Sequence, residues 1–375
     1  MSVALKPSDL YTLDPNDLGR LFTAIQDRGY AVAGPSVRDG AIAFGVLREF
    51  NQLPRGFVDD QQPGQYRLKQ AGDESFFRYT VGPQSIKNVL HPPQQKLWSV
   101  TRSKDKDVTV TPEEAKSQKL ALFGIRSCEV KAIEVLDRVF LGSTFVDQHY
   151  ARRRKDLLII TATCLDPAAV CFCTSMGHGP HPESFDINLT ESLHDGPHRI
   201  LATVGSDVGR SILESIKARS APSNASSTIA TIAAEASAKI TKTLPQAGLP
   251  EFIQANLDHP HWDKVAERCL SCANCTMVCP TCFCSTVEDK TAVTGDHSER
   301  WLRWDSCFTS DHSYIHGGKI HASTKSRYRQ WLSHKLSSWH EQFGTSGCVG
   351  CGRCVAWCPV GIDITAEVKA MRGSP

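Results

Sequence analysis

The sequence contains 15 cysteines, and eight of them fall into two copies of one motif near its C-terminal end. The copies run Cys269-x2-Cys272-x2-Cys275-x3-Cys279-Pro280 and Cys348-x2-Cys351-x2-Cys354-x3-Cys358-Pro359. Three thiolates separated by two residues line a tight loop and can bind three irons of one 4Fe-4S cube. The spacing therefore predicts two iron–sulfur clusters, whose chemistry is the transfer of single electrons.

The fourth cysteine of each motif is expected to reach the other cluster. In a run of this kind it stands at the start of a helix, faces away from its own loop and ligates the second cube. We name the two resulting sets site I and site II. Site I consists of Cys269, Cys272, Cys275 and Cys358. Site II consists of Cys348, Cys351, Cys354 and Cys279.

Zinc ions and disulfide bonds are the other common uses of many cysteines, and both fit this spacing poorly. Structural zinc sites typically take four ligands per ion from separated Cys-x2-Cys pairs rather than from three-plus-one runs. Disulfide frameworks belong mainly to small exported domains, whereas a chain of 375 residues can bury a large core without cross-links. The two complete runs therefore favour iron–sulfur clusters.

Four further cysteines lie in the N-terminal half of the chain. Cys128 follows the predicted strand LALFGI and opens a predicted helix, while Cys164 directly follows the predicted strand DLLIITAT. If these strands are parallel neighbours, both cysteines lie at the carboxyl edge of the sheet, where open α/β sheets bind ligands. The helix N-terminus also favours a thiolate at Cys128. Cys171 and Cys173 follow in a nearby loop.

We name Cys128, Cys164, Cys171 and Cys173 site III and predict that they hold a third 4Fe-4S cluster. Buried free thiols and a zinc ion are the alternatives, because free cysteine is often buried and four thiolates also suit tetrahedral zinc. The cluster is favoured because an electron carrier gains from iron–sulfur chemistry, whereas zinc has no redox chemistry.

Three cysteines remain unassigned: Cys282, Cys284 and Cys307. We expect them to be small buried hydrophobic side chains beside the clusters. Together with Asp305 they could instead form an additional metal site, although their spacing matches no established run of ligands.

The N-terminal part of the chain alternates between predicted strands and helices. Strands are predicted at LALFGI, DLLIITAT and RILATVG, and helices at CEVKAIEVLDRVF and SILESI. This alternation predicts an α/β domain with a mainly parallel sheet, which we assign to residues 1–217. Residues 218–250 are rich in Ala, Ser and Thr and are expected to form a linker or insertion.

Residues 251–375 are predicted to form an α-helical, ferredoxin-type domain with two 4Fe-4S clusters, because no strong alternating strand follows Pro250. Between the motifs, KSRYRQWLSHKLSSWHEQF is a predicted amphipathic helix with Trp331 and Leu332 on its apolar side. Its basic residues, which include Lys335, are expected to lie on a solvated face.

The overall composition excludes several classes of protein. Lys and Arg number 42 against 40 Asp and Glu, so a net charge of +2 supplies no field that attracts nucleic acid or an anionic membrane. No apolar run approaches the ~18 residues of a spanning helix, and the N-terminus lacks the pattern of a signal peptide. We therefore expect a cytoplasmic chain. No G-x-G-x-x-G fingerprint or phosphate-binding loop is present.

Five segments carry a resemblance to a known family. They are FRYTVGPQSIKNVLHPP (77–93), FGIRSCEVKAIEVLDRVF (123–140), CLDPAAVCFCTSMGHGP (164–180), CLSCANCTMVCPTCFC (269–284) and CVGCGRCVAWCPVGIDI (348–364). In these segments the chain resembles the beta subunits of sulfhydrogenases, which are cytoplasmic NiFe hydrogenases linked to NAD(P). It resembles the iron–sulfur subunits of anaerobic sulfite reductases equally well. The resemblance covers most of the chain apart from the Ala- and Ser-rich segment.

The resemblance implies an iron–sulfur subunit that is not itself catalytic. Such a protein relays electrons from or to a flavin- and NAD(P)-binding subunit, with either a NiFe hydrogenase module or a sulfite reductase at the other end. One alternative is a self-contained reductase of sulfur compounds that uses Arg126, His178 and His181 beside site III. An iron–sulfur sensor is another, but no DNA-recognition pattern supports it.

Overall fold

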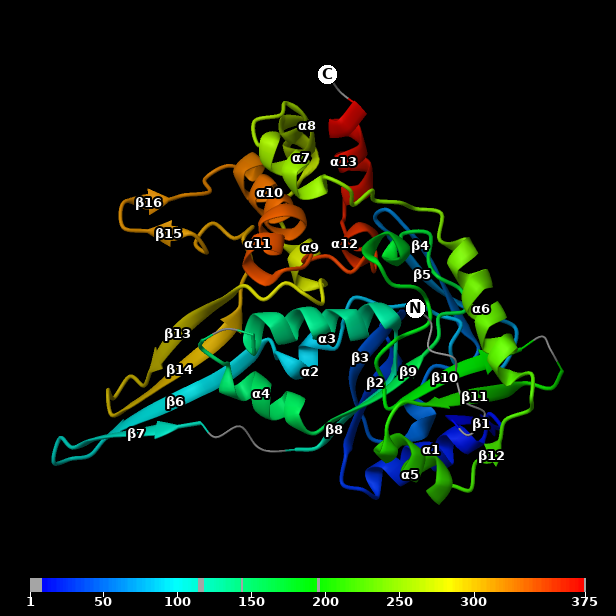
Figure 1. The fold of residues 1–375 in the computed structure, drawn as a ribbon. Helices are drawn as coiled ribbons and strands as arrows, with labels where there is room; N and C mark the ends of the chain where they lie inside the picture. Colours follow the sequence, from blue (N-terminus) through cyan, green and yellow to red (C-terminus); the bar gives the residue numbers. More distant parts are fainter. Residues whose placement is uncertain (1–8, 114–117, 143, 194–195, 374–375) are drawn as a thin grey trace.

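The computed structural model describes residues 9–113, 118–142, 144–193 and 196–373. An eight-stranded sheet forms the larger part, and the helices that follow residue 249 gather at one end of the molecule (Figure 1). The strands of this sheet lie in the order β12 (Arg219–Ser220), β1 (Leu10–Leu13), β11 (Arg199–Val204), β10 (Ile187–Ser192), β9 (Leu157–Ala162), β8 (Leu120–Ile125), β2 (Ala31–Arg38) and β3 (Ala41–Leu47).

The sheet is mixed rather than mainly parallel. The central pairings, β2 with β8, β8 with β9 and β9 with β10, are parallel, and β8 and β9 are the predicted strands LALFGI and DLLIITAT. The pairings toward both edges of the described sheet are antiparallel. Short connections such as Asp39–Gly40 between β2 and β3 explain this, because a tight turn can join only antiparallel strands.

Helices cover both faces of this sheet. α1 (Asp17–Gln26) and α5 (Asp207–Ser215) pack on one face and share a continuous hydrophobic core with it. α3 (Ser127–Phe140) packs on the other face, where Ile133 joins a core that also includes Val349 of the second cysteine motif. The helix that carries Cys128 is therefore packed against the second cysteine run.

A hairpin interrupts the cysteine-rich part of the chain, which is therefore not wholly helical. β13 (Ser285–Thr291) and β14 (His297–Trp304) form it, and β14 pairs with β6 (Gln94–Arg102), which pairs in turn with β7 (Val108–Pro112). The side chains of the hairpin are exposed or half-buried. The hairpin consequently lacks the alternation of apolar and polar residues that marks a strand in the sequence.

The remaining helices of the C-terminal part surround the two cysteine motifs. They are α7 (Leu249–Ala255), α8 (His261–Arg268), α9 (Asn274–Met277), α10 (Thr324–Ser333), α11 (Trp339–Phe343), α12 (Arg353–Ala356) and α13 (Ile364–Gly373). A π-helical turn, η4 (His334–Ser338), joins α10 to α11. These three elements form the predicted amphipathic helix, in which Trp331 and Leu332 are buried as expected.

Smaller elements complete the described fold. They are α2 (Lys87–Leu90), α4 (Gln148–Lys155), the 3-10 turns η2 (Phe50–Gln52) and η3 (Cys173–Met176), and the hairpins β4 (Phe57–Gln62) with β5 (Gln65–Gln70) and β15 (Tyr314–Ile315) with β16 (Gly318–Lys319). Within the part of the chain that the structure describes, no helix is long and apolar enough to cross a membrane.

The Ala- and Ser-rich segment contains a helix, α6 (Ala225–Lys239). The helix is docked rather than fully solvated, because Ile229 and Ala236 are buried. At its end, Lys239 Nζ lies 2.7 Å from a carboxylate oxygen of Asp166. α6 therefore contacts the loop between Cys164 and Cys171.

Candidate metal centres

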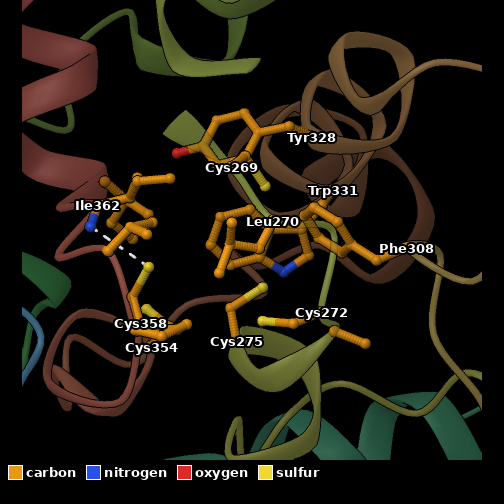
Figure 2. A pocket seen from close by; sticks show the side chains of 14 residues that line it. Cys269, Leu270, Cys272, Cys275, Phe308, Tyr328, Trp331, Cys354, Cys358 and Ile362 are labelled. Carbon is orange, nitrogen blue, oxygen red and sulfur yellow. Dashed lines mark hydrogen bonds between the residues drawn. The ribbon is translucent and has the colours of Figure 1, made fainter. Parts of the chain in front are cut away.

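The four cysteines of site I line one cavity of about 420 Å³. They are Cys269, Cys272, Cys275 and Cys358, and Cys354 of site II also lines this cavity. Figure 2 shows the labelled sulfur atoms around one space, with the rings of Tyr328 and Trp331 beside it. The structure thus brings the last cysteine of the second motif to the first three of the first motif.

Backbone conformation shapes the loop of the first motif. Ser271 and Ala273 adopt left-handed φ angles of 52° and 66°, although neither is glycine. Such conformations cost free energy for residues that carry a Cβ, so they persist only where the surrounding structure imposes them. Here they occur on either side of Cys272, where the chain turns tightly enough to present several sulfur atoms to one space.

The lining of site I fits a sulfur-rich group. Trp331 Nε1 is buried and has no hydrogen-bond partner among the described residues, and Figure 2 shows it directed toward the cysteine sulfurs. An indole N–H is a donor, and sulfur accepts hydrogen bonds. Burial also raises the pKa of Cys275 well above its usual value, so a metal that binds here must displace the thiol proton.

Cys279 lies beside the cysteines of the second motif. Burial is the main cause that raises the pKa of Cys348, to about 12, and of Cys354, and the charge of Cys279 acts in the same direction. The main-chain N–H of Gly350 donates to Cys348 Sγ over 3.4 Å. Site II is therefore also assembled from both motifs.

Lys335 is buried against site II, which corrects the expectation that it lies on a solvated face. Its side chain is only 3% exposed. Its Nζ lies 3.3 Å from Cys279 Sγ and donates to the carbonyl oxygen of Gly347 over 3.0 Å. Helical spacing contained the signal, because Lys335 stands on the same stripe as Leu332 and Trp339. A buried ammonium requires anionic neighbours, which thiolates or a cluster supply.

Arg353 is a second buried cation near site II. Its Nη2 lies 2.8 Å from Glu129 Oε1, and its guanidinium also hydrogen-bonds Cys351. Burial opposes the positive charge, but Glu129 and the neighbouring cysteines raise the pKa of Arg353 above its usual value. Because 224 residues separate Arg353 from Glu129, no local pattern could have revealed this pair.

The structure brings the four cysteines of site III together around a cavity of about 370 Å³. Cys128 lies in the first turn of α3, Cys164 follows β9, and Cys171 and Cys173 lie in the next loop. Burial raises the pKa of all four thiols, that of Cys173 to about 12. At Cys128 burial therefore outweighs the helix N-terminus, which was expected to favour a thiolate.

The three polar residues predicted beside site III make structural contacts. Arg126 donates hydrogen bonds to four main-chain carbonyl oxygens rather than to a carboxylate. His178 Nε2 lies 2.9 Å from the carbonyl oxygen of Val349, and His181 Nδ1 lies 3.2 Å from Thr163 Oγ1. Burial lowers the pKa of both histidines, so both rings are neutral near pH 7.

Site II connects the other two sites. Its Cys351 lines the cavity of site III, and its Cys354 lines the cavity of site I. The main-chain N–H of Phe172 donates to the carbonyl oxygen of Gly350 over 2.9 Å. A Cβ at Gly350 would lie 2.7 Å from the main chain of Cys173, so glycine is required for this close approach. The three sites therefore form a continuous row.

The three unassigned cysteines divide into two groups. Cys282 donates a hydrogen bond to Cys279, whereas Cys284 and Cys307 hydrogen-bond each other. Asp305 accepts hydrogen bonds from residues of its own loop. Among the residues that the structure describes, no three His, Cys, Asp or Glu side chains are arranged to hold a single metal ion.

Comparison with known proteins places this geometry in a class. Residues 268–362 match the family model of the 4Fe-4S dicluster domain, so the chain is an iron–sulfur protein. It is 35% identical over 317 residues to sulfhydrogenase 2 subunit beta of Pyrococcus furiosus, which covers 82% of this chain and 89% of the relative. The chain belongs to the family of sulfhydrogenase beta subunits and is an iron–sulfur electron-transfer subunit. No solved structure matches it.

Replacing Lys335 with Met should lower the reduction potential of a cluster at site II, because a buried positive charge beside Cys279 stabilises the added electron. We expect a shift on the order of 60 mV, equivalent to about tenfold in the one-electron equilibrium constant. A redox titration followed by electron paramagnetic resonance measures it. Lys325→Met, which removes an exposed ion pair to Asp263, is the control and should leave the potential unchanged. An unchanged potential in Lys335→Met with full iron content would contradict this role.

Proposed function

We propose that the chain relays electrons through three 4Fe-4S clusters, between a NiFe hydrogenase module and a flavin- and NAD(P)-binding subunit. The observation that carries this proposal is the continuous row of sites, in which site II contributes a cysteine to the walls of both neighbouring cavities. Closely spaced one-electron carriers suit such a relay. The name of the relative, a sulfhydrogenase subunit, supports a hydrogenase rather than a sulfite reductase as the larger assembly.

The proposed ligands are the cysteines of the three sites. Site I would use Cys269, Cys272, Cys275 and Cys358; site II would use Cys348, Cys351, Cys354 and Cys279; site III would use Cys128, Cys164, Cys171 and Cys173. The two cavities, the buried cations beside sites II and III, and the dicluster match support these assignments. When bound, the clusters would supply one-electron redox chemistry.

Site I is the end of the row nearest to solvent. Cys272 is exposed, and Leu270 and Val360, which line the same cavity, have exposed fractions of 62% and 38%. By contrast, Cys171 and Cys173 of site III are buried. We infer that one redox partner docks over site I, where apolar side chains beside the cavity are available for contact.

The number of clusters can be measured by elemental analysis of protein prepared without oxygen. Three cubes require about twelve irons per chain, and Cys171→Ser should lower the count to about eight because site III loses a ligand. Cys282→Ser, which alters a neighbouring cysteine outside the three sites, should keep the wild-type count. A wild-type count near eight, or one zinc per chain, would reject the cluster at site III.

The exchange of ligands between the motifs predicts the effect of Cys279→Ser. Although Cys279 belongs to the first motif, its loss should damage the cluster held mainly by Cys348, Cys351 and Cys354. Electron paramagnetic resonance of the reduced protein distinguishes the clusters, and Cys358→Ser provides the reciprocal comparison at site I. Loss confined to site I in Cys279→Ser would show that the ligands are not exchanged.

A relay protein should be isolated with its redox partners. We expect purification under native, anaerobic conditions to recover a complex that contains flavin and a hydrogenase subunit, because the clusters need an electron donor and an acceptor. Absorbance spectra, metal analysis and mass spectrometry identify the partners. A stable monomer that reduces sulfite or polysulfide on its own with a reduced viologen dye would contradict the relay.

A further inference from the structure

Cys284 and Cys307 meet at the base of the β13–β14 hairpin. Ser285, the first residue of β13, pairs with Trp304, the last residue of β14. One step further, the main-chain N–H of Asp305 donates to the carbonyl oxygen of Cys284 over 2.9 Å. This register places Cys307 two residues beyond the partner of Cys284, and the two thiol groups hydrogen-bond each other.

An imidazole and a carboxylate complete this group. His312 hydrogen-bonds Cys284, and its Nδ1 lies 2.9 Å from Oδ2 of Asp305. The other carboxylate oxygen of Asp305 accepts hydrogen bonds from the main-chain N–H of Ser306 and the hydroxyl of Thr309, both over 2.7 Å. The carboxylate is therefore held in place and orients the ring. A thiol oriented in this way by an imidazole and a third group is typical of nucleophilic cysteines.

The charges of the group favour a thiolate at Cys284. The hydrogen bond from Cys307 is the main cause that lowers the pKa of Cys284 to about 4; burial opposes it and His312 assists it. The bond to Cys284 raises the pKa of His312 to about 9. Between these two values the thiolate and the imidazolium coexist. Lys87 and His334 are the other charged or titratable groups that face Cys284, and a positive charge on either favours the thiolate.

We propose that Cys284 and Cys307 form a redox-active dithiol that reduces the sulfur–sulfur bond of small-molecule disulfides. Neither residue belongs to the proposed cluster sites, and both are partly exposed, so a small disulfide can reach them. His312 and Asp305 are positioning residues that keep Cys284 ready to attack. Cys307, whose pKa is raised because its proton is shared with Cys284, is the second thiol.

The electrons and atoms of the reaction balance. The Cys284 thiolate attacks one sulfur of the substrate, whose sulfur–sulfur bond breaks as a mixed disulfide forms and one thiolate leaves. Cys307 then attacks the sulfur of Cys284, and its proton passes to the second half of the substrate as that half leaves. The substrate has gained two electrons, and the chain holds a Cys284–Cys307 disulfide.

Two electrons and one proton restore the thiolate and the thiol. The iron–sulfur relay supplies these electrons, so this last step rests on the proposed function. The position of the pair is consistent with such a supply, because Cys307 is close enough to Cys275 of site I for their charges to interact.

Alkylation of the anaerobic holoprotein tests the thiolate. At about pH 6 an ordinary thiol with a pKa of ~8.5 is protonated, whereas Cys284 should react with iodoacetamide. We expect peptide mass spectrometry to find Cys284 alkylated first, and His312→Gln and Asp305→Asn to slow that reaction, the former at least about tenfold. Cys282→Ser is the matched control and should leave the rate unchanged.

An aromatic disulfide whose released thiolate is coloured tests the pair. Wild-type protein should release two more aromatic thiols per chain than Cys284→Ser and should finish with a Cys284–Cys307 disulfide in its peptide map. Cys307→Ser should release only one more and retain the aromatic group on Cys284. Release that does not depend on Cys284, or a peptide map without that disulfide, would overturn the proposal.

Iron content separates this proposal from the relay. Cys284→Ser and Cys307→Ser should keep the wild-type iron count, and loss of one cube from either would overturn the dithiol by making that cysteine a ligand. Slow alkylation of Cys284 in wild-type protein with full iron would overturn it as well. Failure of the relay would appear instead as a low iron count in the wild type, with both thiol reactions intact.

Discussion

A buried ion pair between Arg353 and Glu129 joins the two cysteine-bearing halves of the protein, and the row of metal sites depends on it. The charged groups lie 2.8 Å apart, with side chains 1% and 5% exposed. Arg353 follows Cys351 of site II by two residues, and Glu129 directly follows Cys128 of site III. The pair therefore fixes two distant loops against each other. Removing one partner of such a pair typically costs about 3–5 kcal/mol, because the remaining charge stays buried without compensation.

Electrostatics also explains why buried cations accompany the buried sites. Lys335 lies beside Cys279, and Arg126 opposes the rise that burial causes in the pKa of Cys164. Anionic sulfur ligands removed from water need such neighbours, since an unpaired buried charge is costly. Site I has less need of them, because Cys272 is exposed and water can solvate its charge.

The β13–β14 hairpin has two consequences for the cysteine-rich region. It occupies the long segment between the motifs and docks on β6, so the two motifs can still meet on either side of it. Its base also brings Cys284 and Cys307 to His312. The same chain segment thus spaces the two motifs and assembles a thiol group that is separate from the proposed clusters.

The amino-acid order alone specifies the cysteine runs and predicts the grouping of Cys128 with Cys164. Two residues between cysteines set the local loop whatever the rest of the chain does, and β8, β9 and α3 follow from local apolar patterns. The antiparallel edges of the sheet, the hairpin, the burial of Lys335 and the meeting of Cys284 with His312 became known from the folded chain. Each of these depends on contacts between distant segments or on which face of an element is covered, and local sequence patterns specify neither.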